Sequence, residues 1–199
     1  MSNWCFTRIN IINRNDDDKI ENLYNLIKEW TSNNYMENGF GLQWLGNIVG
    51  NSGIGTIDEG KETDLMCRGS LNYIELVEKN QLLIETETAW VPMLKMWVKI
   101  LDKYLPNAEL IYEAEECVNE LYSTNDESLK DKYIIDCWGI SEIESNWEAS
   151  KEDVINILQK LLNTTEKNTS ILINLLEDSE YNEMISVHKW NFDDISEWD

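Results

Sequence analysis

Residues 71–117 read LNYIELVEKNQLLIETETAWVPMLKMWVKILDKYLPNAELIYEAEEC, and their pattern is the clearest indication of fold class in the chain. Large apolar and polar residues alternate over 71–77 and again over 81–90, with a turn-like break between them, which predicts a β-hairpin. Pro92 suits the first turn of a following helix, whose apolar residues recur at helical spacing. Residues 109–117 alternate once more. The stretch therefore predicts strand, strand, helix, strand.

Toward the N-terminus, the same reasoning adds one strand and one helix. Residues 4–12 are rich in β-branched residues and alternate, and residues 17–31 have apolar residues at i, i+3, i+4 and i+7. The order β-α-β-β-α-β predicts an α+β fold of the ferredoxin-like, split βαβ type, with an antiparallel sheet and two helices on one face. Residues 32–66 hold seven of the nine glycines and show little periodicity, so we expect a long Gly-rich loop there.

Past the fourth strand, we expect an extension of strands and helices. Residues 133–138 predict a strand that pairs near Leu121-Tyr122, and Ser150 with Asp153 resembles a capping box that opens a helix. Residues 169–187 predict another helix, and residues 190–199 a short strand or a tail. We therefore expect a ferredoxin-like domain over 1–122 and an acidic strand and helical extension over 123–199, packed on the first part.

The charge of the chain excludes whole classes of partner. The 199 residues include 38 acidic and 16 basic side chains, for a formal net charge of −22. Residues 107–153 hold 14 acidic and 3 basic side chains, and residues 177–199 hold 8 acidic and 1 basic. Nucleic-acid affinity needs Lys and Arg to replace phosphate counterions, so direct binding of nucleic acid or of an anionic membrane is not expected. A basic protein surface or a small ligand is the expected partner.

The remaining composition indicates a cytoplasmic protein. The apolar runs fall short of the about 18 residues that a membrane span needs, and the first residues, MSNWCFTRIN, lack the pattern of a signal segment. Four cysteines in such a chain indicate reduced thiols.

Four short motifs resemble those of a known family. They are Met1-Ser2-Asn3-Trp4-Cys5, Thr88-Ala89-Trp90-Val91-Pro92, Tyr104-Leu105-Pro106 and Tyr112-Glu113-Ala114-Glu115. On these residues, the chain over about 1–122 resembles the YubB ferredoxin-like family, which is found mainly on plasmids and phages. The resemblance implies a ferredoxin-like fold and a mobile-element origin, and hence the cytoplasm of a bacterial host cell as the place where the protein acts, and it implies no activity.

Carboxylates on alternate positions of two predicted strands form the candidate binding surface. Glu85 and Glu87 point off one face of their strand, and Glu109, Glu113 and Glu115 off one face of theirs. In a ferredoxin-like sheet of order 4-1-3-2, both rows share the open face, with Arg8 the compensating cation. RNA-binding sheets of this architecture carry basic residues, so an acidic face favours a protein partner.

Other chemistry has weaker support. Cys5, Cys67 and Cys117 are expected at one end of the sheet, and with Cys137 a zinc site is conceivable, although buried apolar thiols are the commoner arrangement. His188 has no Cys or Ser partner in a recognisable setting, and an acid pair of the glycosidase kind has no supporting cleft. We expect no enzyme activity, no cofactor and no metal. Five tryptophans are expected in the core: Trp4, Trp30, Trp44, Trp90 and Trp97. Of these, Trp4 and Trp90 are expected at the same end of the sheet, where they close the core under the long loop.

The expected function is inhibition by occupation of a basic surface. We expect a mobile-element-encoded, anti-CRISPR-like acidic protein that binds a host defence nuclease where the nuclease holds nucleic acid. The alternatives are a small-ligand module in which residues 37–66 cover a pocket at the Trp4 and Trp90 end, and a metalloprotein using the cysteines. The expected partner-binding residues are Glu85, Glu87, Glu109, Glu113, Glu115, Glu116, Glu120, Asp126, Glu127, Glu142, Glu144, Glu148, Asp193, Asp194 and Trp198.

Overall fold

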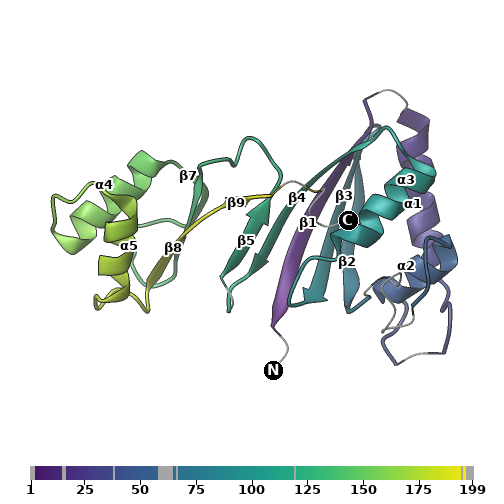
Figure 1. Cartoon of the computed structure of the whole chain (residues 1–199), viewed down its shortest axis with the longest axis horizontal. Helices are drawn as coiled ribbons and strands as arrows, with labels where there is room; N and C mark the ends of the chain where they lie inside the picture. Colours follow the sequence, from purple (N-terminus) through teal and green to yellow (C-terminus); the bar gives the residue numbers. More distant parts are fainter. Residues whose placement is uncertain are drawn as a thin grey trace. The chain divides into compact units, whose positions relative to one another are not determined.

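The α+β architecture predicted from the sequence is confirmed in a computed structural model, which describes residues 3–14, 17–37, 39–57, 65, 67–118, 120–193 and 195 (Figure 1). The chain divides into two units. The first comprises Met1–Asn125 and Asp193–Asp199, and the second comprises Asp126–Phe192. None of the helices in the described ranges combines the length and the apolar character that crossing a bilayer requires.

The first unit is built on an antiparallel sheet. Its strands are β1 (Trp4–Ile12), β2 (Gly69–Glu78), β3 (Gln81–Ala89), β4 (Glu109–Glu116) and β5 (Leu121–Thr124). They follow the order β2-β3-β1-β4-β5, and each neighbouring pair is antiparallel. The four strands predicted over this region are present within a few residues of the expected bounds, as is the hairpin between β2 and β3. A fifth strand, β5, lies beside β4. From the sequence, its residues Leu121 and Tyr122 are expected only as the partner of a strand over 133–138.

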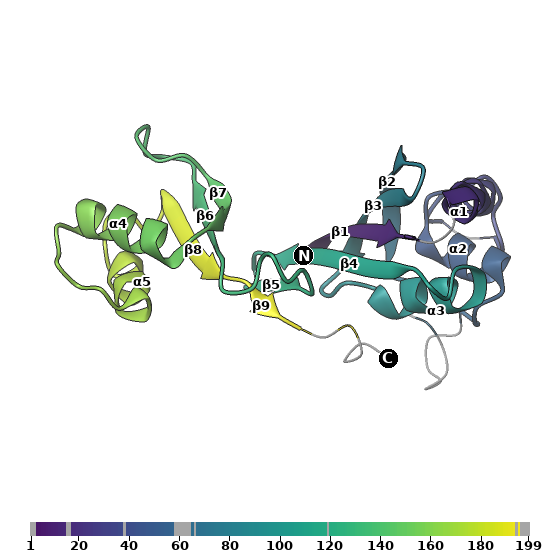
Figure 2. The ribbon, with the colours of Figure 1, turned by 90° about the horizontal axis from the view of Figure 1, so that it is seen from above.

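Three helices cover one face of this sheet (Figure 2). They are α1 (Asp17–Trp30), α2 (Leu45–Ser52) and α3 (Leu94–Tyr104). Each strand turns alternate residues toward them, so β1 buries Cys5, Ile9 and Ile11. The core also contains Ile20, Leu23 and Ile27 of α1, Met96, Trp97 and Ile100 of α3, Leu82 and Ile84 of β3, and Leu110, Tyr112 and Ala114 of β4.

The helix α2 corrects the expectation of an irregular loop over 32–66. Its residues Leu45, Ile48 and Val49 are buried in the core. Gly46 and Gly50 weaken its intrinsic helix propensity, which explains why the sequence pattern did not indicate it. Both glycines have a packing reason, because a Cβ at Gly46 would fall on the Trp44 ring and a Cβ at Gly50 on the Tyr35 ring.

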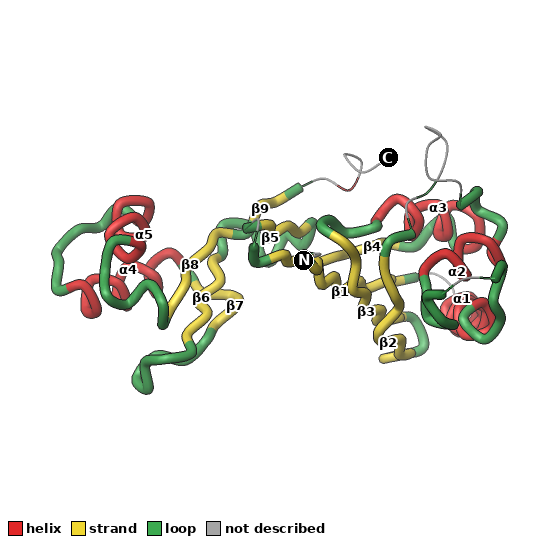
Figure 3. The backbone as a smooth tube through the Cα atoms, turned by 90° about the horizontal axis from the view of Figure 1, so that it is seen from below, coloured by secondary structure: helices red, strands yellow, loops and turns green. Residues whose placement is uncertain are grey.

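The second unit is a three-stranded sheet with two helices, which lie side by side (Figure 3). Its elements are β6 (Tyr133–Cys137), β7 (Asn146–Ala149), α4 (Lys151–Leu162), α5 (Thr169–Glu177), β8 (Ile185–Lys189) and β9 (Asn191–Phe192). The strand order in the sheet is β7-β6-β8, and its pairings are antiparallel. Its separate core includes Tyr133, Ile135, Val154, Leu158, Leu172, Leu176, Ile185 and Val187.

Three expectations for this region meet different outcomes. The capping box at α4 is confirmed, because the Ser150 hydroxyl accepts the Asp153 N–H while the Asp153 carboxylate accepts the Ser150 N–H. The predicted pairing of 133–138 with Leu121-Tyr122 is wrong, because β6 pairs with β7 and β8. The helix predicted over 169–187 ends at Glu177, and a turn leads into β8, which contains His188.

Candidate acidic and aromatic binding face

The face of the first sheet that the helices leave uncovered carries the candidate site. On β1 the residues between the buried ones are Trp4, Phe6 and Arg8, and all three are exposed. In the register of the sheet, Arg8 lies between Glu85 on β3 and Glu113 on β4. Two residues along β1, Phe6 lies between Glu87 and Glu115.

These six residues form two parallel rows across β3, β1 and β4. Trp4 continues the same face of β1, and Tyr73 of β2 lies opposite Glu85. We call this surface the acidic–aromatic face and define it by Trp4, Phe6, Arg8, Tyr73, Glu85, Glu87, Glu113 and Glu115. The prediction that the carboxylates of β3 and β4 point off one face around Arg8 agrees with the register. Glu109 lies further along the same face, opposite Ile12, and its carboxylate pairs with Arg14 at 3.0 Å.

Arg8 is the cation at the centre of one row. Its Nε and Nη2 both donate to Glu85 Oε1, at 3.2 and 3.0 Å. The Arg8 side chain is 56 % exposed and that of Glu85 38 %, so solvent screens the pair and it contributes little to stability. The pair holds two side chains of opposite charge in a fixed geometry on the sheet.

The exposed aromatic residues of this face were not predicted as site residues. Trp4, Phe6 and Tyr73 are 48 %, 47 % and 45 % exposed. The expectation that Trp4 and Trp90 close the core is wrong: Trp90 is 47 % exposed, whereas Trp30, Trp44 and Trp97 are buried as predicted. The signal was available in the sequence, because Trp4 and Phe6 share the parity of Arg8 along the strand and not that of the buried Ile9.

Tyr73 and Trp90 each interact with a charged side chain. The Tyr73 hydroxyl donates to Glu75 Oε2 at 2.9 Å, and this bond raises the pKa of Tyr73 above its usual range. The Arg68 guanidinium lies 5.4 Å from the centre of the Trp90 ring, which is a cation–π contact. Trp90 has a φ of 70° and its N–H donates to the Asn3 carbonyl, so the ring is presented at the end of the sheet where β1 begins.

Glu116 and Glu120 do not belong to this face. Glu116 is 1 % exposed and accepts the Val118 N–H at 2.9 Å, so the expectation that it contacts a partner is wrong. It follows Glu115 in a strand whose side chains alternate between faces, and it therefore points away from the solvent. Glu120 is exposed in the turn before β5 with a φ of 53°.

The other predicted partner-binding residues lie outside the sheet of the first unit or beyond the described residues. Asp193 accepts the Ser123 hydroxyl at 2.7 Å. Asp194 and Trp198 lie outside the described residues. Five carboxylates belong to the second unit: Asp126, Glu127, Glu142, Glu144 and Glu148. All but Asp126 are well exposed, and Glu127 pairs with Lys130 at 3.6 Å.

The cysteines are not arranged as a metal centre in the described part of the chain, where no three Cys, His, Asp or Glu side chains are grouped to hold an ion. Cys5 and Cys67 are buried, Cys137 is half-buried and Cys117 is exposed. Burial raises the pKa of the Cys5 thiol to about 11, so this thiol stays protonated near neutral pH. The Sγ of Cys67 donates to the Leu65 carbonyl at 3.3 Å.

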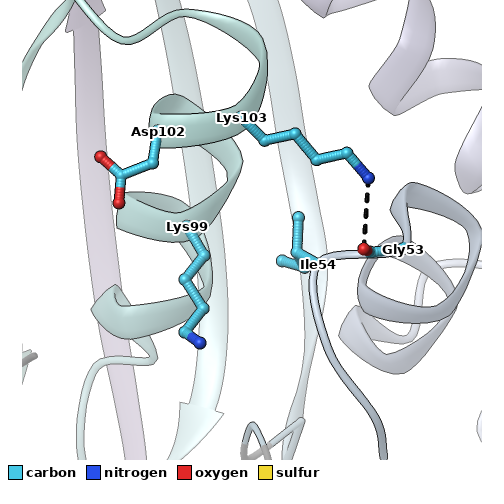
Figure 4. A pocket seen from close by; sticks show the side chains of 5 residues that line it. All are labelled: Gly53, Ile54, Lys99, Asp102 and Lys103. Carbon is cyan, nitrogen blue, oxygen red and sulfur yellow. Dashed lines mark hydrogen bonds between the residues drawn. The ribbon is translucent and has the colours of Figure 1, made fainter.

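A shallow pocket lies elsewhere on the first unit, between the end of α2 and α3. Its volume is about 310 Å³, and Figure 4 shows its lining residues, Gly53, Ile54, Lys99, Asp102 and Lys103. The Lys103 ammonium donates to the Ser52 carbonyl at 2.8 Å and to that of Gly53 at 3.2 Å, and these bonds tie α3 to the end of α2. The pocket includes part of the segment 37–66 but neither Trp4 nor Trp90.

Comparison with protein-family models, with curated proteins and with solved structures gives no match for this chain. The resemblance to the YubB ferredoxin-like family therefore stays a prediction that rests on the motifs quoted for it.

Proposed function

We propose that this chain is a non-enzymatic binding protein whose acidic–aromatic face occupies a basic surface of a partner protein. The observation that carries the proposal is the placement of Glu85, Glu87, Glu113 and Glu115 in two rows around β1. Neighbouring strands lie about 4.8 Å apart and alternate residues about 7 Å apart. The four carboxylates therefore leave the sheet at the corners of a rectangle of about 7 by 10 Å.

The sheet holds the backbone positions of these carboxylates, so the backbone does not have to become ordered when a partner binds. The strands that bear the carboxylates are the central strands β3 and β4, each paired on both sides. Less conformational entropy is lost when a rigid surface binds than when a loop does. The formal net charge of −22 also steers a basic partner toward the chain and accelerates association at low salt.

The partner class that this chemistry favours is a nucleic-acid-binding nuclease of a bacterial defence system. Such an enzyme lines its groove with Lys and Arg for phosphates, and fixed carboxylates can pair with the same cations. We place the first unit in the ferredoxin-like class, an assignment supported by the strand order β2-β3-β1-β4 with α1 and α3 on one face. The resemblance to a plasmid and phage family supports a mobile-element origin for an inhibitor of this kind.

The experiment is a binding and cleavage assay with a purified RNA-guided nuclease and its guide RNA. The fourfold variant Glu85→Gln, Glu87→Gln, Glu113→Gln, Glu115→Gln removes the charges while keeping the side-chain shapes. Exposed ion pairs contribute about 0.5 kcal/mol each, so we expect about 2 kcal/mol, or roughly 30-fold weaker binding and inhibition. Binding of the unchanged protein should also weaken as salt is added.

A matched control distinguishes the effect of the carboxylates on this face from the effect of the total charge of the protein. The variant Glu21→Gln, Glu29→Gln, Glu177→Gln, Glu180→Gln changes the formal charge equally at exposed positions that do not belong to the acidic–aromatic face. We expect it to bind nearly as well as the unchanged protein. Equal losses in both variants would show that total charge matters and that the face does not, and undiminished inhibition by the first variant would refute the proposal.

A small-ligand function is the second candidate, and one observation favours it. Two residues of the segment 37–66, Gly53 and Ile54, line the 310 Å³ pocket beside α3. If this pocket binds a ligand, Ile54→Ala should weaken quenching of tryptophan fluorescence by that ligand, while the fourfold glutamine variant of the face should not.

A further inference from the structure

The row Glu87–Phe6–Glu115 differs from its neighbour in one respect. In both rows two carboxylates flank β1, but the central position is Arg8 in one and the exposed ring of Phe6 in the other. The Phe6 side chain is uncharged and 47 % exposed, and Glu87 beside it accepts a hydrogen bond from Asn72 Nδ2 at 3.4 Å. We propose that this row binds an arginine side chain of the partner, whose guanidinium stacks on Phe6 between Glu87 and Glu115. This inference rests on the proposed function and names the chemistry of its partner.

The chain itself shows how guanidinium groups behave on this sheet. One row away, Arg8 donates from Nε and Nη2 to Glu85, which is the carboxylate recognition that a bound arginine would repeat with Glu87. At the end of the sheet where β1 begins, the Arg68 guanidinium lies over the Trp90 ring, 5.4 Å from its centre. Both components of the proposed site, carboxylate pairing and a cation–π contact, are thus already used by arginines of the same unit.

Arginine fits this row better than lysine does. Its guanidinium is planar and can stack on an aromatic ring while its edge donates to carboxylates on either side. An ammonium group is more strongly hydrated and lacks the planar fork. The row has a ring at its centre and carboxylates at its edges, so the geometry selects the planar cation.

The positions of Trp4 and Phe6 extend the inference to two arginines. The two rings lie at alternate residues of β1 and are both about half exposed. Alternate side chains of an extended peptide have the same spacing, about 7 Å, and lie on one side of the peptide. An extended Arg-x-Arg segment along β1 would therefore place one guanidinium on each ring, and the occupant we commit to is such an arginine-rich segment.

The test uses the full chain and two labelled peptides of equal length and charge, one with Arg-Gly-Arg repeats and one with Lys-Gly-Lys repeats. Binding is measured by fluorescence anisotropy at low salt. We expect the arginine peptide to bind about fivefold more tightly, as one exposed cation–π contact provides. The double variant Trp4→Leu, Phe6→Leu, which removes both rings, should bring the two affinities to within about twofold. Phe6→Tyr, which keeps an aromatic ring, should retain the preference.

Phe40→Leu is the matched control, because Phe40 is an exposed phenylalanine of the same unit that lies outside the sheet. It should leave the preference for arginine unchanged. Equal binding of both peptides by the unchanged chain, or a preference that survives removal of both rings in Trp4→Leu, Phe6→Leu, would overturn the arginine site and leave the proposed function standing. Absence of binding by either peptide would overturn both.

Discussion

The buried side chain of Asn47 provides the sharpest test of how this fold holds its irregular segment. Asn47 is fully buried, and its Oδ1 accepts the Tyr35 N–H at 3.0 Å. Its Nδ2 donates to the carbonyls of Gly41 and Leu42, both at 3.0 Å. One side chain thus ties down both ends of the segment 35–42. We predict that Asn47→Ala destabilises the first unit strongly.

The magnitude follows from these three bonds, since the fourth, from Asn47 Nδ2 to Asn34 Oδ1, is long at 3.4 Å. Each hydrogen bond contributes about 1 kcal/mol net, so their loss from a fully buried site should cost about 3 kcal/mol. The control is Asn51→Ala: Asn51 also donates to two carbonyls, those of Trp30 and Asn33 at 2.9 Å, but it is exposed. Water replaces its bonds after truncation, so we expect about 1 kcal/mol or less.

Urea denaturation followed by circular dichroism measures both variants, and hydrogen exchange of the Tyr35 amide reports on the segment directly. Exchange at this amide should accelerate in Asn47→Ala. If Asn47→Ala costs no more than Asn51→Ala, then burial does not determine the value of these bonds and the reasoning is refuted.

Three further predictions concern the second unit and the thiols. Ser150→Ala should destabilise α4 by about 1 kcal/mol, as measured by urea denaturation, while Ser150→Thr should cost much less; equal costs would contradict the capping role. The hydrogen bond from Lys189 lowers the pKa of Asp131, so the stabilisation from this pair is present at neutral pH and is lost as the pH falls through the lowered value. A double-mutant cycle with Asp131→Asn and Lys189→Gln should show coupling at pH 7 that vanishes in strong acid; pH-independent coupling would contradict it. Burial and a pKa of about 11 should protect Cys5 from iodoacetamide at neutral pH, whereas the exposed Cys117 should be alkylated first, as peptide mass spectrometry would show.

The main elements of the first unit could be predicted because their patterns are local. Alternation over β1, β3 and β4 and helical spacing over α1 and α3 each follow from one buried and one exposed face. The pairing of Glu85 and Glu113 beside Arg8 then followed from the strand order. The exposure of Trp4 and Phe6 follows from the same parity, although large aromatic residues are more typical of a core.

The elements that were missed depend on contacts between distant residues. The helix α2 contains glycines where rings of Trp44 and Tyr35 fit, so its sequence suits its packing and not its propensity. The residues of β8 were predicted as the end of the helix over 169–187. They form a strand because β8 pairs with β6, which lies about 50 residues earlier in the chain. Glu116 illustrates the same limit, because composition marks it as a surface residue and the strand buries it.

The point where the chain leaves the first unit and the point where it returns are adjacent in space. The Asp193 N–H donates to the Thr124 carbonyl at 2.9 Å, and Ser123 donates to the Asp193 carboxylate. The 67 residues Asp126–Phe192 thus form an insertion, and the residues that flank it are hydrogen-bonded to each other within the first unit. Insertions are tolerated where the two flanking chain ends lie close together, so replacing residues 126–192 by a short turn is expected to leave the strands of the acidic–aromatic face in place.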